Sequence, residues 1–384
     1  MSDERRKPRN TVEEDVFRDL CRNFATKDVA PYVQAAERDS IFPREVFIAA
    51  AKAGLSGLHA PQSLGGADMG VTQEAMLIEE MAKINPNLAV VPLVQGVGGA
   101  LMWEFGNSEH HALARANNAG ELLLALAVTE PEAGSDVQGI KTSARRVGDD
   151  WVLDGLKSFI TLGGDCEVML VLARTDPDKG RGGMHFFAVD RDSPGLETSK
   201  MATYANRAVP TFRVMFNQVR VPESRRLNAG FGAIMAGFNR ERILVSARWL
   251  GHMQTALAWG LEYAKVRRQF GKPIGANQSI AFPLAQAHVD IEATRRVAYH
   301  AASRWDSGAP IKDIITEVSS AKLFATQAVY RVTQTVLHTA GGWGVTEELP
   351  AMRMALDALV APVTVGSYEI QLRAIAKQLG LPCD

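Results

Sequence analysis

Glu241, which lies between two arginines in the run FNRERILVSA, is a candidate general base. A glutamate can accept a proton from carbon near neutral pH when apolar surroundings raise its pKa. A structural role is also open, because Asn239 could cap a helix and the helix dipole favours an acidic side chain in the first turn. Taken alone, the run favours the structural role.

Two other segments combine small, hydroxyl-bearing and aromatic residues in a way that suits a ligand. AVTEPEAGSD, residues 127–136, places threonine, glycine and serine in one loop, where small residues let backbone N–H groups approach a ligand closely. LDGLKSFITLGG, residues 153–164, places an aromatic residue and a threonine between a lysine and a glycine pair. By composition, the first is also compatible with a plain turn and the second with a strand and its turn.

Several function classes are disfavoured by the composition and by the motifs that the sequence lacks. It contains no P-loop, no HExxH and no GxSxG motif, and its eight histidines are scattered, so we predict no metal site. A formal net charge of −1 gives no electrostatic reason to expect a nucleic-acid or membrane partner. Three widely spaced cysteines fit a reducing compartment and the charged N-terminus does not resemble a signal peptide, so we expect a cytoplasmic protein.

The candidate residues must be positioned by three regions of the chain that differ in their pattern of apolar and polar residues. Apolar residues recur at three- and four-residue intervals through residues 1–126, which predicts an N-terminal α-helical domain. Short β-branched and aromatic runs such as EVMLVLAR alternate with turn-rich segments through residues 127–232, which predicts a middle β domain. Helical periodicity returns through residues 233–384, so the predicted fold class is α+β with three domains.

Several motifs, taken in order, resemble those of the acyl-CoA dehydrogenase family of flavoproteins, and the resemblance covers nearly the whole chain. GLSGLHAPQSLGG is similar to a segment of the family's first domain, and TEPEAGSD is similar to its flavin loop. EYAKVRRQFGKPIGANQ, AGGWG and VGSYEIQ are similar to segments of its last domain. The family fold consists of an α-helical domain, a small β barrel and a C-terminal four-helix bundle. This order agrees with the helical, β and helical regions predicted from the residue patterns.

The resemblance implies an FAD site built from separate parts of the chain. The flavin loop and the triplet that follows it would contact the flavin ring, the phosphates or the thioester through Val128, Thr129, Gly134, Ser135, Phe159, Ile160 and Thr161. The last domain would reach the FAD of a neighbouring subunit through Arg267 and Phe270, with further cofactor contacts from Gln278, His338, Gly341, Gly342, Ser367 and Glu369. The family habit therefore predicts a homo-oligomer, as a tetramer of paired dimers.

The resemblance also bears on Glu241. Most members carry their base in a Tyr-Glu-Gly-Thr segment, and the corresponding run here, TVGS at residues 364–367, has no carboxylate. Isovaleryl-CoA and long-chain acyl-CoA dehydrogenases instead take the base from a helix early in the last domain, and aligning FNRERILVSA with that helix places Glu241 at the base position. Ser135, Arg242 and Val365 are then substrate-binding candidates, with the Val365 N–H bonding the thioester oxygen.

The implied reaction is FAD-dependent α,β-dehydrogenation of an acyl thioester to the 2-enoyl thioester, with Glu241 as base and flavin N5 as hydride acceptor. The acyl group could be carried by CoA or by an acyl carrier protein, and electron-transfer flavoprotein is the family's usual electron acceptor. Two alternatives stay open: a related flavoenzyme that runs monooxygenase or thioester-lyase chemistry, and a non-catalytic flavin-binding protein.

Overall fold

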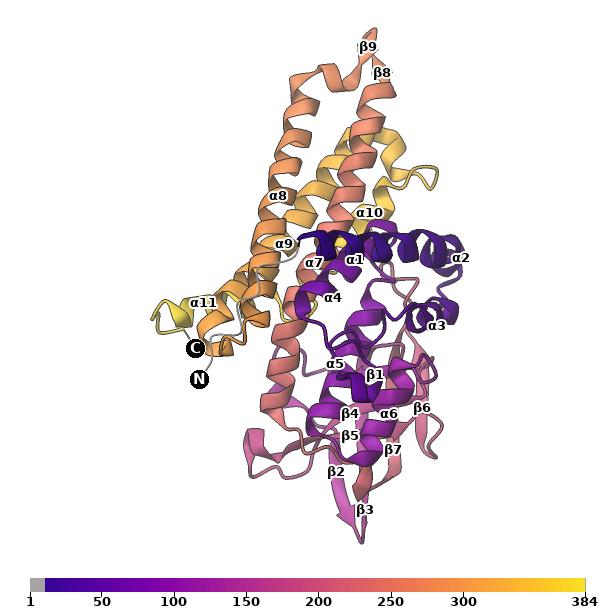
Figure 1. Cartoon of the computed structure of the whole chain (residues 1–384), viewed down its shortest axis with the longest axis vertical. Helices are drawn as coiled ribbons and strands as arrows, with labels where there is room; N and C mark the ends of the chain where they lie inside the picture. Colours follow the sequence, from indigo (N-terminus) through magenta and orange to yellow (C-terminus); the bar gives the residue numbers. More distant parts are fainter. Residues whose placement is uncertain (1–10, 384) are drawn as a thin grey trace.

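The computed structural model describes residues 11–383, in which a helical region, a sheet and a second helical region follow one another. Figure 1 shows the N-terminal helices beside the middle of the molecule, with the sheet at one end and the hairpin of β8 and β9 at the other. This order confirms the predicted three-domain α+β fold, in which the middle domain is a curled sheet.

The N-terminal region is helical, as the sequence periodicity predicts. Its elements are α1 (Thr11–Phe24), η1 (Ala25–Val29), α2 (Ala30–Asp39), α3 (Arg44–Lys52), η2 (Gln62–Leu64), α4 (Val71–Ile84), α5 (Val90–Phe105) and α6 (Ser108–Asn118). Most side chains of α4 are buried, because this helix packs against α1 on one side and against α7 and α8 of the C-terminal region on others. It therefore connects the two helical regions.

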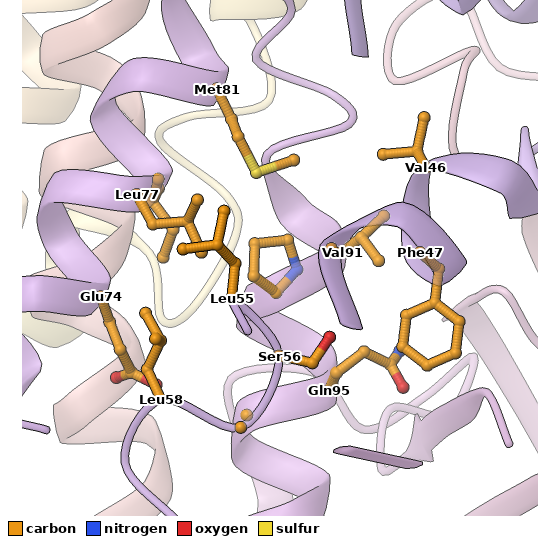
Figure 2. Close-up of a pocket in the computed structure, with 15 residues that line it drawn as sticks. Val46, Phe47, Leu55, Ser56, Leu58, Glu74, Leu77, Met81, Val91 and Gln95 are labelled. Carbon is orange, nitrogen blue, oxygen red and sulfur yellow. The ribbon is translucent and has the colours of Figure 1, made fainter. Parts of the chain in front are cut away.

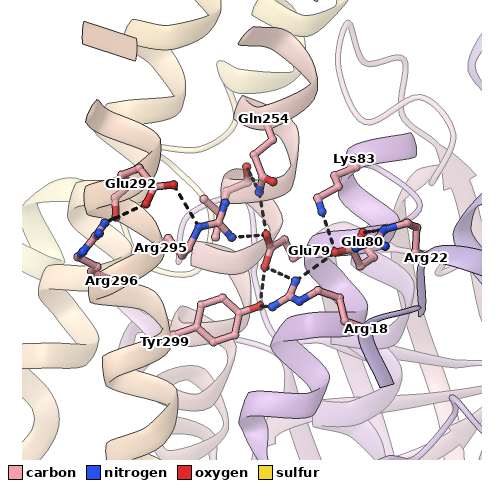
Figure 3. Close-up of polar contacts among 11 residues, drawn as sticks. Arg18, Arg22, Glu79, Glu80, Lys83, Gln254, Glu292, Arg295, Arg296 and Tyr299 are labelled. Atoms are coloured by element: carbon pink, nitrogen blue, oxygen red, sulfur yellow. Dashed lines mark hydrogen bonds and ion pairs between the residues drawn. The ribbon is translucent and has the colours of Figure 1, made fainter. Parts of the chain in front are cut away.

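The Glu79 carboxylate of α4 ties these helices together through charge (Figure 3). Its oxygens accept hydrogen bonds from Arg18 of α1 at 3.0 Å and from Arg295 of α8 at 2.9 Å, and it is fully buried. Burial alone would raise the pKa of Glu79, but the attraction of Arg18 and the bonds from Tyr299 and Gln254 lower it to about 2. The charged carboxylate is therefore the form that the fold stabilises.

Glu79→Gln should destabilise the protein, and the deficit should depend on pH. A pKa lowered from 4.5 to about 2 corresponds to about 3 kcal/mol of stability, present above pH 4.5 and lost as the pH falls toward 2. Urea denaturation of wild type and variant at several pH values measures this. Glu292→Gln, a more exposed member of the same group, should have little effect, and an equal deficit at pH 7 and pH 3 would contradict the assignment.

The middle region forms a single sheet of seven strands. They are β1 (Leu124–Ala127), β2 (Ser143–Val147), β3 (Asp150–Thr161), β4 (Val168–Arg174), β5 (Met184–Asp190), β6 (Leu196–Lys200) and β7 (Thr211–Pro222), in the order β1-β4-β2-β3-β7-β6 with β5 paired to β4. The short 3-10 helices η3 (Val137–Gly139) and η4 (Gly180–Gly183) lie between strands, and η5 (Glu223–Arg225) leads from β7 to α7. Because β1 begins at Leu124, the strand crosses the predicted boundary at 126/127, and the domain boundaries stay a prediction.

Strand β4 explains why the predicted run EVMLVLAR is almost continuously apolar. Leu170 and Leu172 face a cluster shared with α5, whereas Met169 and Val171 face a second cluster inside the curled sheet. A strand covered on both faces requires apolar residues at every position, because successive side chains point in opposite directions. The sheet is therefore fixed against the N-terminal helices on one face and closed around its own core on the other.

The C-terminal region contains long helices that pack as a bundle. Its elements are α7 (Phe231–Val266), β8 (Arg268–Gln269), β9 (Lys272–Pro273), η6 (Ile274–Ala276), α8 (Gln278–Asp306), α9 (Ile311–Ala340), η7 (Gly341–Val345), α10 (Ala351–Ala358) and α11 (Tyr368–Gln378). Helix α9 packs against α7, α8 and α11. Helix α7 has 36 residues and is thus about 54 Å long, so it runs from the sheet to the hairpin at the far end (Figure 1).

Candidate active site

Glu241 lies in the interior of α7 and not at its start. The helix begins at Phe231 after Gly230, so Glu241 is its eleventh residue. The helix-end interpretation, with Asn239 as cap, is therefore wrong. The segment before Asn239 continues the helix because Phe231, Ile234 and Phe238 pack against the cluster between α5 and the sheet. Asn239 instead accepts a hydrogen bond at Oδ1 from Nη1 of Arg242, at 2.6 Å.

The Glu241 carboxylate is half-buried and makes no hydrogen bond or ion pair with any residue from 11 to 383. Burial raises its pKa to about 7, although the positive charges of Arg242 and Arg248 act in the opposite direction. A carboxylate whose only role was to interact with a helix end would be exposed to solvent or paired with a cation. An unpaired carboxylate with a pKa near 7 has the properties of a general base.

The two arginines beside Glu241 have different partners. Arg240 points away from Glu241 and forms an ion pair with Glu74 of α4, whose other oxygen lies 2.8 Å from Nδ1 of His59. Arg242 forms no ion pair among the described residues, and its Nε lies 3.5 Å from the carbonyl oxygen of Val365. Only Arg242 therefore links Glu241 to the loop that precedes α11.

Val365 has a backbone conformation that is unusual for a β-branched residue. Its φ is 54° and that of Gly366 is 81°, so two consecutive residues are left-handed. Such a conformation costs roughly 1–3 kcal/mol for a non-glycine residue and is retained where surrounding contacts impose it. The Val365 N–H donates to no acceptor within residues 11–383, so it is available to a ligand. The structure thus brings Glu241, Arg242 and Val365 together.

Lys322 of α9 holds this loop through two of its carbonyl groups. Its side chain is fully buried, and Nζ donates to the carbonyl oxygens of Gly366 at 2.7 Å and of Ala361 at 3.3 Å. Burial lowers the pKa of Lys322 to about 8. Sequence analysis missed this residue, although a lysine inside the apolar helical run SSAKLFA was a usable signal. Ser367, the N-cap of α11, and Glu369 in its first turn lie on the same loop.

Phe159 projects from an irregularity in β3. The pairing of β3 with β7 shifts register between Lys157 and Ile160, and Phe159 has a φ of 60°. Its ring is 62% exposed while Ile160 is buried, because a bulge redirects one side chain out of the sheet. An exposed aromatic ring on a rigid strand suits stacking against a flat cofactor.

The loop TEPEAGSD lies beside this bulge. The Ser158 N–H donates to the Thr129 carbonyl at 2.9 Å, and Glu130 and Ala133 close the loop by bonding to each other at 3.0 and 3.2 Å. Gly134 and Ser135 are exposed, and a Cβ added at Gly134 would meet no atom within 4 Å. The residues that sequence analysis assigned to the flavin, from Val128 to Thr161, are therefore adjacent, and they leave open space for a cofactor.

A buried ion pair holds the loop against β3. Nζ of Lys157, which is fully buried, donates to Oε1 of Glu130 at 2.8 Å and to the Val128 carbonyl at 2.9 Å. The two Glu130 oxygens also accept from the N–H groups of Lys141 and Thr142. Burial lowers the pKa of Lys157 to about 8, while Glu130 acts to raise it. Sequence analysis noted this lysine within the segment LDGLKSFITLGG but gave it no role.

The remaining predicted cofactor residues lie at the other end of the bundle. Arg267 and Phe270 are at the hairpin of β8 and β9, Gln278 opens α8, and Phe270 is 97% exposed. His338, Gly341 and Gly342 lie where α9 passes into η7, which Tyr263 of α7 contacts through the Ala340 carbonyl at 3.3 Å. Figure 1 places this end opposite the sheet. Within one chain the two sets of residues are therefore not brought together.

A narrow cavity in the N-terminal region has a different character (Figure 2). Apolar side chains of α3, α4 and α5 form most of its wall, and none of the predicted site residues lines it. Two of its polar residues are already bonded: Glu74 pairs with Arg240, and Gln95 bonds the backbone of Leu124 and the Asn117 amide. It is a packing cavity and not the site of the chemistry.

Other kinds of site find no support in the described residues. Between residues 11 and 383, no group of three or more His, Cys, Asp or Glu side chains is arranged to hold a metal ion. The helices of the same range are each too short or too polar to cross a membrane.

A carboxylate ready to accept a proton, a free main-chain N–H nearby and an exposed aromatic ring define a site for cofactor-assisted chemistry on a carbonyl compound. Residues 11–113, 125–219 and 228–380 match the family models described as acyl-CoA dehydrogenase N-terminal, middle and C-terminal domains. The chain therefore belongs to the acyl-CoA dehydrogenase family, whose members are FAD-dependent oxidoreductases.

Individual relatives agree with this assignment over nearly the full length. The chain is 35% identical over 378 residues to an acyl-CoA dehydrogenase of Bacillus subtilis, covering 96% of this chain and 98% of that one. The butyryl-CoA dehydrogenase structure from Megasphaera elsdenii has a TM-score of 0.90 at 31% identity, covering 95% and 97%. A glutaryl-CoA dehydrogenase structure from Mycobacterium smegmatis, in complex with FADH2, has a TM-score of 0.89 at 25% identity, covering 96% and 94%.

Proposed function

We propose that Glu241 is the base in the FAD-dependent α,β-dehydrogenation of an acyl thioester. The observation that carries the assignment is an unpaired, half-buried carboxylate with a pKa near 7, next to the loop of Val365, which has no carboxylate of its own. Among the residues of that loop, from 364 to 367, no side chain could accept the proton at neutral pH.

The roles of the other residues follow from their positions. Removing the α proton places negative charge on the thioester oxygen, which the free Val365 N–H would stabilise by a hydrogen bond. Arg242 holds the Val365 carbonyl, and Lys322 holds the Gly366 carbonyl, so that N–H is fixed before the substrate binds. FAD, when bound, supplies the acceptor for the hydride that leaves the β carbon.

The FAD site would use Phe159 for stacking and the hydroxyls of Thr129 and Thr161 near the flavin ring, with Ile160 buried behind it. Gly134 and Ser135 would approach the phosphates or the thioester from the exposed side of the loop.

The reaction is tested by anaerobic mixing of the FAD-bound protein with a panel of acyl-CoA thioesters. We expect the flavin absorbance to bleach and one equivalent of 2-enoyl thioester to be detected by mass. Bleaching with no enoyl product, or oxygen incorporation in air, would favour the monooxygenase alternative. A protein that binds no FAD on reconstitution would favour a non-catalytic role.

We also propose that each FAD site is shared between two chains of a homo-oligomer, expected to be a tetramer. The support is the separation, within one chain, of strands β1 and β3, beside which Thr129 and Phe159 lie, from the hairpin of β8 and β9 that carries Arg267 and Phe270 (Figure 1). An aromatic side chain that is 97% exposed at a hairpin tip has little to do in an isolated subunit.

Phe270→Ser should therefore lower the bound FAD at least tenfold and shift the protein toward smaller oligomers. The thermal midpoint of the apo monomer should not change, because the Phe270 side chain has almost no contacts within the chain to lose. FAD content and light scattering after size exclusion measure the two effects. Tyr204→Ser, at an 88% exposed aromatic of the middle region, is the matched control. A Phe270→Ser protein that binds as much FAD as wild type would contradict the shared-site proposal.

The remaining features of the proposal concern partners and location. The thioester would be carried by CoA or by an acyl carrier protein, and electron-transfer flavoprotein would accept the electrons. A cytoplasmic location and domain boundaries at 126/127 and 232/233 complete the proposal.

A further inference from the structure

Arg248 is a buried cation on the same helix face as Glu241. It follows Glu241 by seven residues, which is nearly two full turns, so both side chains leave α7 on one side. Helical side chains lean toward the N-terminus, which directs the Arg248 guanidinium back toward Glu241. Their mutual attraction is reflected in the pKa of each group, since each charge favours the ionised form of the other.

The guanidinium of Arg248 is held only by uncharged groups. Nε donates to the Pro86 carbonyl at 2.6 Å, and Nη2 donates to the side-chain oxygens of Asn206 at 2.7 Å and Asn87 at 3.3 Å. The group lies 4.2 Å from the centre of the Trp249 ring, and the residue is 3% exposed. These contacts fix its position without neutralising its charge.

No carboxylate among residues 11–383 forms an ion pair with Arg248. Asp357 and Glu37 are near enough to affect its pKa, but both are committed elsewhere: Asp357 accepts from Asn87 and Asn206, and Glu37 accepts from Asn85 and Asn87. Burial lowers the pKa of Arg248 to about 10, although the negative charges of Asp357, Glu241 and Glu37 act in the opposite direction. Burying an unpaired ion lowers the stability of the folded state, so buried charges usually have a counter-ion.

The two N–H groups on Nη1 of Arg248 have no acceptor in the described part of the chain. The Nη1 atom is not completely enclosed by the protein, so a ligand atom could contact it. Arg242 and Arg248 thus both lie near the Glu241 carboxylate, and neither forms an ion pair among residues 11–383.

We propose that Arg248 binds a carboxylate at the far end of the acyl chain, so that the preferred substrates are thioesters of short dicarboxylic acids. A carboxylate oxygen can accept a charge-assisted hydrogen bond from a free N–H of Nη1, the donor that the described residues leave unused. The chain is short because the guanidinium leans toward Glu241, which must reach the α carbon. This inference rests on the proposed dehydrogenation and specifies its substrate class.

The test compares acyl-CoA pairs of equal chain length that differ in a terminal carboxylate: glutaryl-CoA with pentanoyl-CoA, and adipyl-CoA with hexanoyl-CoA. For wild type, kcat/KM should be at least about 30-fold higher for the carboxylate-bearing member of a pair. Arg248→Met should remove this preference, whereas Arg248→Lys, which keeps the charge, should retain part of it. Arg296→Met, at an exposed arginine of α8, should leave the ratio unchanged.

The ratio within a pair does not depend on how much of the variant is folded, because both substrates meet the same enzyme. Calorimetric binding of the carboxylate-bearing and alkyl 2-enoyl products gives a second reading that requires no turnover, and Arg248→Met should weaken only the former. Wild type that prefers the alkyl member, or a preference unchanged by Arg248→Met, would overturn the inference. If alkyl thioesters bleach the flavin, the dehydrogenase proposal survives that result; if no thioester does, the dehydrogenase proposal fails, and the binding measurement still decides the role of Arg248.

Discussion

Glu241→Gln protein should bind FAD and thioester normally but bleach its flavin about 10²–10⁴-fold more slowly than wild type. Glutamine has nearly the same shape as glutamate and cannot accept the proton. Because Glu241 makes no hydrogen bond or ion pair with residues 11–383, the substitution breaks no contact of the fold. Stopped-flow absorbance under anaerobic conditions measures the rate, and FAD content and ligand binding show whether the site is intact.

The pH dependence gives the same prediction a second form. Glu241 must be deprotonated to act, and its pKa of about 7 means that the wild-type bleaching rate should rise as the pH increases through about 7. The residual rate of Glu241→Gln should lack this rise. Glu262→Gln, at an exposed glutamate of the same helix, is the matched control and should behave as wild type at every pH. A pH profile retained in Glu241→Gln would assign the titration to another group.

Lys157→Met should destabilise the middle region by about 3–5 kcal/mol and reduce FAD binding. The change leaves the Glu130 carboxylate, which is 6% exposed, without its ion partner, and removes the donor that holds the Val128 carbonyl. Methionine fills a similar volume, so the loss comes from the missing charge and not from a cavity. Urea denaturation of the apo protein and fluorescence titration with FAD measure the two effects.

Lys141→Met is the control for this experiment, because Lys141 forms an ion pair with Glu132 in the same loop at the surface. Exposed pairs contribute little to stability, so its urea midpoint and FAD affinity should match those of wild type. Equal effects of the two substitutions would mean that burial of the Lys157 pair has no special role.

The sequence was sufficient for the order of the domains and for most of the elements. Helical periodicity and β-branched runs reflect which faces are buried, and that information is local, as β4 illustrates. The motif resemblance identified the family and supplied the segments that we propose for the site. It also directed attention to Glu241 through the missing carboxylate at Val365, which local periodicity alone could not have done.

What the sequence could not supply were features that depend on three-dimensional packing. The start of α7 at Phe231 is set by contacts of Phe231 and Ile234 with the sheet, so Asn239 only resembled a cap. The left-handed conformation of Val365 occurs in a loop that Lys322 holds from a different helix. The unpaired charge of Arg248 is visible only when every neighbouring carboxylate is located, because in sequence it is one arginine among many.

The most direct test of Glu241 as base separates proton removal from hydride transfer. A CoA thioester of 3,3-dimethylbutanoic acid has hydrogens on its α carbon and none on its β carbon, so dehydrogenation cannot follow deprotonation. Incubated in D2O with the FAD-bound wild-type protein, this thioester should gain deuterium at the α carbon, detected by mass, while Glu241→Gln should leave it unlabelled. Deuterium incorporation by Glu241→Gln at the wild-type rate would contradict the account, and the base would then have to be sought elsewhere in the site.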